Sequence, residues 1–193
     1  MFNFSLGNST QGCPDSHFQV TQVIGIPMPA AIKDGYEEII SNPMAQWPDE
    51  NSVEVTDCDE VPDGYLKTYA FTIGWQWGFR TNLANVDISD YTTVSFMIRA
   101  LDLQNPSLFH LYQGDTYLKN FYYADTSWHE IVLTKDDANT WTMTVDGTVV
   151  DGFTSTVTNL KDLFNFSLGN ATEGSPESHF QVTHIIGVKS QNP

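Results

Sequence analysis

Alternating apolar and polar positions predict β-strands along most of the chain. In Thr92–Arg99 the apolar Val94, Phe96 and Ile98 share one face, and Trp141–Val145 alternates in the same way, so each segment has one apolar face. Asp146-Gly147 then supplies the positive φ angles of a two-residue hairpin turn. Further strands are predicted at Tyr65–Ile73, Leu108–Tyr112, Tyr117–Tyr123, Trp128–Thr134, Phe164–Leu168 and His179–Val188.

Helix signals are few: a turn or two around Gly35–Ile40 and a short helix near Asn159–Asp162. Many short strands spaced by about ten residues are typical of β-sandwiches and barrels. The pattern therefore predicts an all-β fold built as an antiparallel β-sandwich.

One segment of the chain occurs twice. Residues 2–26 and 164–188 are identical at eighteen of 25 positions, at an offset of 162 residues. Shared strand propensity does not produce identity of this extent, so the segment is a duplication. Two origins fit: a tandem array with a repeat period near 162 residues, or a terminal duplication within a single protein.

The array interpretation divides the chain into four parts. Residues 1–26 are the tail of a preceding repeat unit, and residues 27–34 are a linker rich in proline. Residues 35–189 form the sandwich, and residues 190–193 start the next linker.

In this scheme the first copy is a strand pair without its own domain, so it exposes an apolar face and unpaired edges. It either adds to the edge of the neighbouring sheet, or takes the closing position and frees the C-terminal copy for another subunit. The residues expected to carry this assembly are apolar and equivalent in the two copies: Phe2, Phe4, Phe18, Val20, Phe164, Phe166, Phe180 and Val182.

Composition excludes several classes of protein. The 193 residues include 8 Lys and Arg against 24 Asp and Glu, a net charge of −16, and 40% of them are hydrophobic. The hydrophobic content excludes wholesale disorder, and the negative field disfavours nucleic acid and anionic lipid as partners. Membrane insertion is not expected, because no apolar run approaches the roughly 18 residues that span a bilayer.

Four stretches resemble, in order, the jelly-roll sandwich of carbohydrate-binding modules and the wider lectin and laminin-G-like group. Val86–Arg99 resembles the segment that leads into a core strand, and Trp128–Leu133 resembles a later strand. Trp141–Val150 is similar to the laminin-G-like hairpin. His179–Val188 occupies the place of the closing strand, with Thr183-His184 where the family has an Asp pair. The resemblance implies a jelly-roll β-sandwich and a sugar ligand.

A group of aromatic residues lies among glycines and polar residues. Sugar rings stack their apolar faces on such aromatic platforms, while polar side chains bond the hydroxyls. The candidate carbohydrate-binding residues are Trp75, Trp77, Arg80, Tyr112, Tyr117 and Tyr122. The alternative is that these side chains belong to the core and rim of the sandwich.

The segment 57–64 holds four acidic residues before a predicted strand. Oxygen ligands among turn-forming residues suit Ca²⁺. Because modules of the resembled type often hold a structural calcium near their paired termini, the resemblance implies Asp57, Asp59 and Asp63 as ligands. A solvated acidic loop is the alternative.

Cys13 and Cys58 are the only cysteines, and they form either a disulfide that ties the first copy to the sandwich or two free thiols. Four N-glycosylation triplets lie in the repeated segment: Asn8 and Asn170 in turn-rich stretches, Asn3 and Asn165 within strands.

Catalysis finds little support in the sequence. Retaining glycosidases need two carboxyl groups about 5 Å apart, whereas Glu130 stands alone on its strand and Glu37 and Glu38 are adjacent, hence on opposite faces.

We therefore expect an extracellular protein that is not an enzyme. The main hypothesis is a secreted or cell-surface repeat that associates with neighbouring copies of itself by β-strand addition, in a structural or adhesive filament. The alternative is a carbohydrate-binding module that recognises a polysaccharide or glycan through its aromatic platform.

Overall fold

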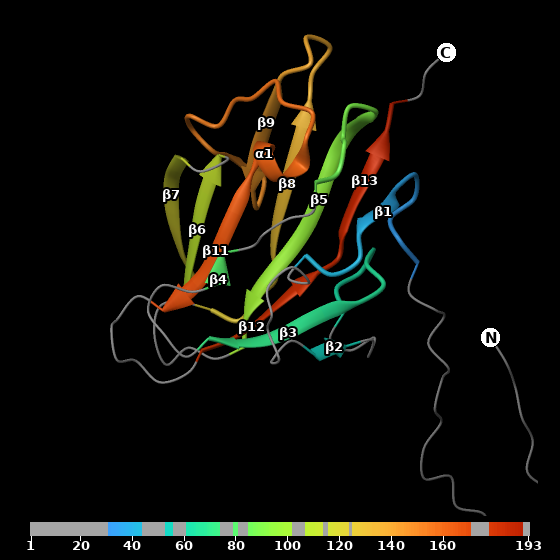
Figure 1. The fold of residues 1–193 in the computed structure, drawn as a ribbon. Helices are drawn as coiled ribbons and strands as arrows, with labels where there is room; N and C mark the ends of the chain where they lie inside the picture. The colour runs from blue at the N-terminus through green and yellow to red at the C-terminus, as the bar shows by residue number, and fades with distance from the viewer. Residues whose placement is uncertain are drawn as a thin grey trace, which may run out of the picture.

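The fold is an antiparallel β-sandwich of two sheets (Figure 1), which confirms the predicted all-β class. The computed structural model describes residues 31–43, 53–55, 61–73, 79–80, 85–101, 107–113, 116–123, 125–170 and 178–190. The predicted strand pair within residues 1–26 lies outside these ranges.

The larger sheet of the described residues has the strand order β10-β9-β8-β5-β12-β3-β2, and β13 joins it between β5 and β1. Its strands are β1 (Glu37–Ile40), β2 (Val53–Val55), β3 (Thr68–Ile73), β5 (Tyr91–Ala100), β8 (His129–Lys135), β9 (Trp141–Val145), β10 (Thr148–Val149), β12 (Ser178–Thr183) and β13 (Ile185–Lys189).

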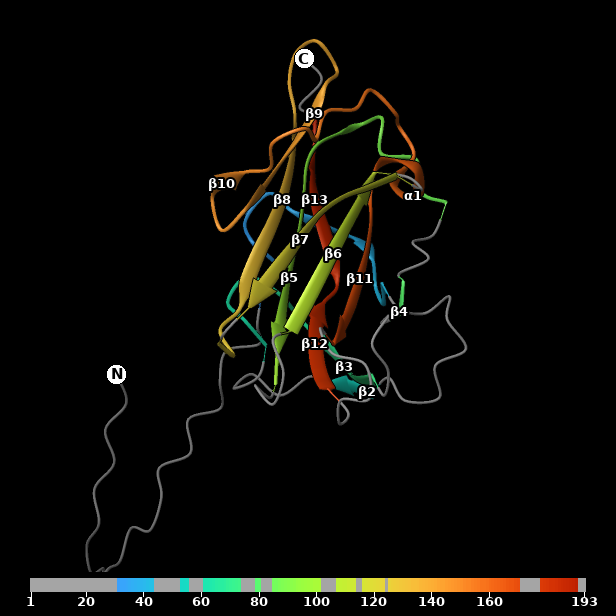
Figure 2. The same ribbon diagram turned by 90° about the vertical axis from the view of Figure 1, so that its left-hand side faces the viewer.

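The smaller sheet has the strand order β4-β11-β6-β7. Its strands are β4 (Phe79–Arg80), β6 (Ser107–Gln113), β7 (Thr116–Tyr123) and β11 (Asn165–Asn170). Figure 2 looks onto this sheet, with β6 and β7 in front of β5 and β8 of the larger sheet.

The predicted strand His179–Val188 is two strands in the structure. It breaks at His184, where the chain changes neighbours: β12 pairs with β3, and β13 pairs with β1. Both halves pair with the same long strand, β5, on their other side. The repeated segment therefore supplies inner strands to both sheets, because β11 likewise lies between β4 and β6.

The core lies between the sheets and follows the predicted alternation. Val94, Phe96 and Ile98 of β5 are buried, as are Trp141 and Met143 of β9. Each second residue along a strand faces the core, so one continuous cluster fills the interior.

Aromatic residues of the C-terminal copy also belong to this core. The Phe164 ring stacks on the Phe96 ring at 5.4 Å between centroids and an interplanar angle of 15°. Phe180 and Val182 are buried in the same cluster. The predicted assembly residues Phe164, Phe180 and Val182 therefore form part of the core of this chain.

One predicted helix is wrong. Gly35–Ile40 was expected to form a helical turn, but Glu37–Ile40 is strand β1, paired antiparallel with β13. A turn precedes the strand, in which the Tyr36 amide donates to the Lys33 carbonyl and Gly35 has φ +79. Pairing with β13, whose second edge would otherwise have no partner strand here, outweighs the local helix propensity of this segment.

The other local predictions near turns are confirmed. Helix α1 (Leu160–Leu163) begins after Asn159, whose side chain accepts a hydrogen bond from the Lys161 amide. Asp146 and Gly147 have φ angles of 50 and 74 degrees, and β9 pairs with β10 across this turn.

A small second cluster covers the outer surface of the larger sheet. Val61 and Tyr65 pack on Ile186 of β13, and Ile32 and Tyr36 border them. The Lys33 amide also donates to the Gly64 carbonyl at 3.0 Å. Ile32 and Lys33, which fall within the predicted linker 27–34, thus pack against the sandwich.

Candidate functional site

Strand register aligns polar residues in one row across the smaller sheet. Arg80 of β4 pairs with Ser167 of β11. Ser167 pairs with His110 of β6, and His110 pairs with Asn120 of β7. Residues paired across antiparallel strands share one face of the sheet. The predicted sugar contact Arg80 therefore shares its face with this polar row.

The register positions of all three predicted sugar-binding tyrosines fall on the same face. Tyr112 and Tyr122 each lie two positions along their strands from the residue in the row. Tyr117 is the register partner of Tyr112. Leu111, next to Tyr112, is fully buried in the core, so the face that carries Tyr112 is the outer one. We call this surface the small-sheet face; it comprises the register positions Arg80, His110, Tyr112, Tyr117, Asn120, Tyr122, Asn165 and Ser167.

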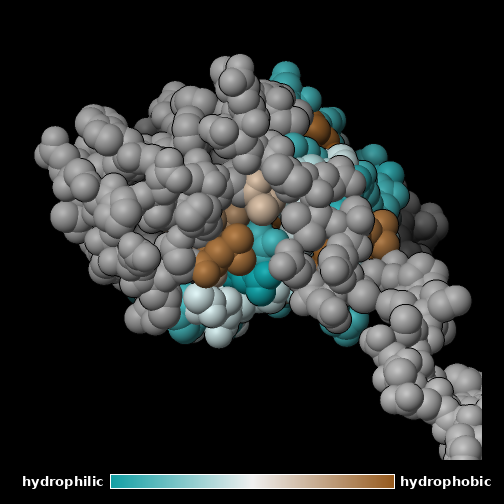
Figure 3. All heavy atoms as spheres, turned by 90° about the horizontal axis from the view of Figure 1, so that it is seen from below, coloured by the Kyte–Doolittle hydropathy of each residue, from teal (hydrophilic) through white to brown (hydrophobic). Residues whose placement is uncertain are grey.

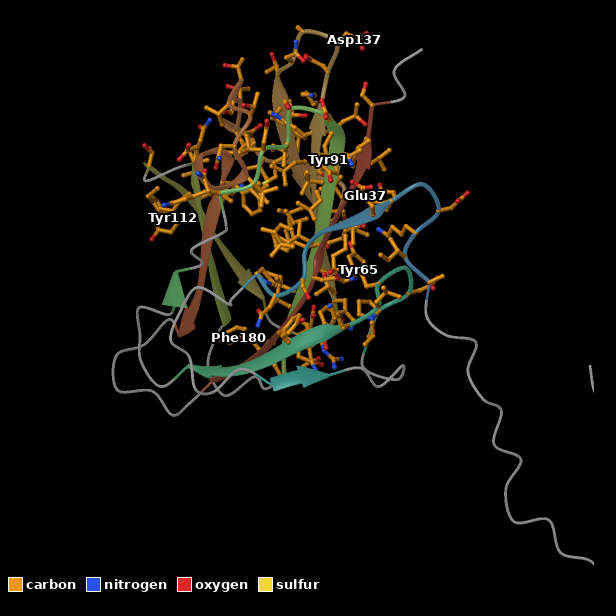
Figure 4. All side chains as sticks on the ribbon, turned by 45° about the vertical axis from the view of Figure 1, so that its right-hand side comes forward. Glu37, Tyr65, Tyr91, Tyr112, Asp137 and Phe180 are labelled. Atoms are coloured by element: carbon orange, nitrogen blue, oxygen red, sulfur yellow. The ribbon has the colours of Figure 1, made fainter. Side chains whose placement is uncertain are left out.

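Tyr112 and Tyr117 form an aromatic pair on this face. Their ring centroids lie 5.9 Å apart at an interplanar angle of 73°, which is a favourable edge-to-face arrangement. Tyr117 is 51% exposed. In Figure 4 Tyr112 lies on the opposite side of the sandwich from Tyr91 and Glu37.

An irregularity in β7 places Tyr117 opposite Tyr112. The register with β6 shifts between Leu111 and Tyr112, so β7 holds one extra residue there. Leu118, next in sequence, packs against the core cluster. The extra residue therefore makes Tyr117, and not Leu118, the register partner of Tyr112.

Several predicted site residues lie outside the described part of the chain. Trp75 and Trp77 precede β4 and are among them, as are Asp57, Asp59, Cys13, Cys58, Asn3 and Asn8. Asn165 lies in β11 as expected, whereas Asn170, expected in a turn-rich stretch, is the last residue of the same strand. Asn165 is the register partner of Tyr112. Asp63 is within the described ranges, where no group of three or more His, Cys, Asp or Glu residues is arranged to hold a metal ion.

A buried histidine on the larger sheet is a polar feature that the sequence did not indicate. The His184 side chain is fully buried and its Nδ1 lies 2.7 Å from Glu38 Oε2. Lys67 Nζ lies 3.3 Å from the same oxygen. Burial lowers the pKa of His184, and the hydrogen bond to Glu38 opposes this effect. The group joins β1, β13 and the segment before β3.

A second polar group lies on the outer surface of the larger sheet. Lys33 forms an ion pair with Glu130 of β8, and its ammonium lies 5.1 Å from the centroid of the Tyr65 ring. The Tyr65 hydroxyl lies 2.7 Å from Ser95 Oγ, and burial raises the pKa of Tyr65. These contacts fix the segment 31–36 and Tyr65 to the sheet, which is a structural role.

The glutamates considered for catalysis have fixed partners. Glu37 accepts hydrogen bonds from Lys189 Nζ at 2.7 Å and from the Tyr91 hydroxyl at 2.5 Å. These bonds, that from Lys189 first, hold the pKa of Glu37 below its usual value. Glu38 faces the other way, toward His184, as strand alternation requires. The two carboxylates therefore do not face a common site.

A shallow polar hollow of about 340 Å³ lies at one end of the sandwich. Its lining includes Asp90, Lys135, Asp136 and Asp137, and Figure 4 labels Asp137 in the loop at this end. Asp136 Oδ1 accepts from the Ala138 and Thr140 amides. The Asp136 and Asp137 pair therefore forms a polar turn between β8 and β9.

The opposite end of the sandwich is where β5 finishes. Leu101 is 39% exposed there, and Figure 3 shows brown, apolar surface beside teal, hydrophilic surface at this end.

Among the described helices, none has the length and apolar character needed to cross a membrane.

No family model and no curated protein matches this chain. Solved structures with a similar arrangement include one titled for cell entry of botulinum neurotoxin type C through two ganglioside molecules, at 13% identity and a TM-score of 0.36, covering 80% of this chain and 48% of the other.

Two further solved structures are similar at the same level. The ligand-binding domain of botulinum neurotoxin serotype D, in complex with N-acetylneuraminic acid, has 13% identity and a TM-score of 0.37, with 83% and 49% coverage. The binding domain of Paraclostridial Mosquitocidal Protein 1 has 12% identity and a TM-score of 0.38, with 75% and 44% coverage. This chain spans half or less of the length of these proteins, and likeness at this level carries no information about ligands.

Proposed function

We propose that this protein is a non-catalytic carbohydrate-binding β-sandwich that binds glycans on its small-sheet face. The observation that carries the proposal is the register: four of the six residues selected as sugar contacts from the sequence occupy one face of one sheet. Arg80 comes from β4 and the three tyrosines come from the consecutive strands β6 and β7, so the face joins two separate parts of the sequence.

The chemistry of this face suits a sugar. An exposed aromatic ring stacks on the apolar face of a pyranose, and amide, hydroxyl and guanidinium groups bond its hydroxyls. Tyr117 supplies the exposed ring, and the register row of Arg80, Ser167, His110 and Asn120 consists of residue types that carry polar groups.

Charge favours neutral glycans over acidic ones. The net charge of −16 repels uronates, sulfates and sialic acids at long range. We therefore expect neutral polysaccharides such as glucan, xylan or mannan to be the ligand class.

The test is a screen of the full chain against immobilised neutral and acidic glycans, followed by titration calorimetry. The protein should be made in a host without N-glycosylation, because Asn165 is in register with Tyr112 and lies in a glycosylation triplet. Tyr117→Ala should weaken binding by roughly 5- to 30-fold, or about 1–2 kcal/mol, and Tyr117→Phe should retain it.

Val149→Ala is the matched control, because Val149 is 62% exposed on β10 of the other sheet. A chain that binds none of the glycans, or that binds equally well after Tyr117→Ala, contradicts the proposal.

Self-association through strand addition, an extracellular location and calcium at the acidic segment stay predictions. Calcium is checked by whether EDTA lowers the melting temperature of the full chain. Association is checked by negative-stain microscopy, which distinguishes filaments from monomers.

A further inference from the structure

The segment 164–188 fills a central position in the sandwich. Its strand β11 lies between β4 and β6, and β12 and β13 lie between β5 on one side and β3 and β1 on the other. We call the place that this segment fills the closing slot. Both sheets lose an inner strand when the slot is empty.

Contacts inside the closing slot are specific. Gln181 Oε1 accepts a hydrogen bond from Arg99 Nε at 2.6 Å, and Thr183 Oγ1 accepts one from the Met97 amide at 2.9 Å. Phe164 stacks on Phe96. An occupant of the slot must therefore match several side chains, not only the strand pattern.

Gly187 adds a steric requirement. A Cβ atom built there would lie 2.5 Å from Ile39 Cδ1, 2.6 Å from the Thr93 carbonyl oxygen and 2.9 Å from Tyr91 Cδ1. Since one of these atoms belongs to the backbone of β5, the slot accepts only glycine at this position without distortion.

The first copy, residues 2–26, meets these requirements. Phe164 and residues 180–187 are buried, and their counterparts are Phe2 and residues 18–25. Seven of these nine pairs are identical, including Gly25 for Gly187. The two that differ are Gln22 for His184 and Val23 for Ile185.

Both differences are compatible with the slot. Val for Ile removes one methylene group, which a core tolerates at small cost. A glutamine at the place of His184 can accept from the Leu66 amide through Oε1 and donate to Glu38 through Nε2. His184 makes bonds to these same two groups.

The order of the chain favours the first copy. Residues 23–26 precede β1 with only residues 27–36 between them, and the slot places their counterparts antiparallel to β1. His184 and Glu38 are by contrast separated by 146 residues. Closing a shorter loop loses less conformational entropy. Against this, Pro27 stands at the place of Lys189, so the Lys189–Glu37 ion pair has no equivalent.

We propose that the closing slot is a second binding site, whose ligand is residues 2–26 of the same chain. The two copies compete for one slot, and the sandwich closes on either. The copy that is displaced leaves the sandwich with its apolar positions uncovered. This inference is independent of carbohydrate binding.

The test uses three full-length variants that place a charge in one copy or in both. Phe180→Asp blocks the C-terminal copy, Phe18→Asp blocks the first copy, and the third variant carries both changes. Each single variant should retain the β-sheet circular dichroism and a cooperative melt, with a melting temperature lowered by roughly 10 °C or less. The double variant should be unfolded.

Phe96→Asp is the control, because Phe96 lies in β5 and has no second copy. It should unfold the chain as the double variant does. A Phe180→Asp chain that is as unfolded as the double variant overturns the proposal.

Size-exclusion chromatography over a hundredfold range of protein concentration tests the source of the strands. The Phe180→Asp chain should elute as a monomer throughout. A folded form that appears only at high concentration, as a dimer or a larger species, overturns the assignment of the ligand to the same chain.

Discussion

His184 Nε2 accepts a hydrogen bond from the Leu66 amide at 3.0 Å, and its Nδ1 lies 2.7 Å from Glu38 Oε2. Because Nε2 accepts, the proton of the neutral ring is on Nδ1 and donates to Glu38. The pair joins β1 to the break between β12 and β13. It stabilises the point at which the closing strand changes neighbours.

Acid should destabilise this arrangement. Burial lowers the pKa of His184 below its ordinary value of 6.5, although Glu38 opposes this. The unfolded chain therefore binds a proton before the folded chain does. Stability is complete above about pH 6.5 and should fall by up to about 1.4 kcal/mol per pH unit toward pH 5. Urea unfolding at a series of pH values measures the free energy of unfolding, in a Phe18→Asp chain where only β11–β13 fill the slot.

The control for this pH dependence is His184→Gln in the same Phe18→Asp chain. Lys67 and Tyr65 surround the site in both chains, and Glu37 loses its ionic stabilisation only at a lower pH, below its ordinary value of 4.5. The free energy of unfolding of the glutamine variant should not change between pH 6.5 and 5. If it falls as steeply as in the parent chain, a group other than His184 causes the pH dependence.

Tyr65 and Ser95 should be energetically coupled. Both side chains are fully buried, and their hydroxyl oxygens lie 2.7 Å apart. Tyr65→Phe or Ser95→Ala alone should lower the free energy of unfolding by about 1–2 kcal/mol, because each leaves a buried hydroxyl with a lost partner. The free energy of unfolding of the double variant should fall by less than the sum of the two single losses. Strict additivity in chemical denaturation would contradict the coupling.

The aromatic stack in the core should dominate stability. Phe96→Ala removes a buried ring that Phe164 stacks on, and should cost about 3–5 kcal/mol. Val149→Ala, at a solvent-exposed position on β10, should change stability by about 0.5 kcal/mol or less. Thermal unfolding of both variants checks the contrast, and comparable losses would be inconsistent with this core.

The β9–β10 turn should need glycine for its backbone alone. Gly147 has φ +74, and a Cβ added there meets no atom within 4 Å. Gly147→Ala should therefore cost about 1 kcal/mol through strain. Thr148→Ala, at an exposed site in the adjacent strand, is the comparison. If the two variants have the same melting temperature, the turn in solution differs from the one described.

Strand positions could be predicted from the sequence because two-residue alternation is a local signal. Trp141–Val145 matches β9 to the residue, and Thr92–Arg99 lies within β5. Arg80, Tyr112 and Tyr117 were grouped because aromatic residues lie there among glycines and polar residues along the chain, and their role in sugar binding stays a prediction. Their common face depends on the pairing of β4, β11, β6 and β7, which is a long-range property.

Features that depend on tertiary contacts were not predictable. β1 was mistaken for a helical turn because its partner, β13, lies far away in sequence. The break at His184 was missed because His179–Val188 has no proline or other clear strand-breaking signal and was read as one strand. The duplication offered one available signal: of the two pairs that differ between residues 18–25 and 180–187, only Gln22 and His184 differ in side-chain chemistry, and His184 makes the buried polar contacts.

The most direct test of the central claim, that the small-sheet face binds glycans, is fluorine NMR of the full chain with its eight tyrosines replaced by 3-fluorotyrosine. Single Tyr→Phe variants assign the signals, and the titrant is a neutral glycan retained in the screen. We predict that the signals of Tyr112 and Tyr117 shift while those of Tyr65 and Tyr69, on the larger sheet, hold their positions. Shifts confined to Tyr65 and Tyr69 would contradict the account.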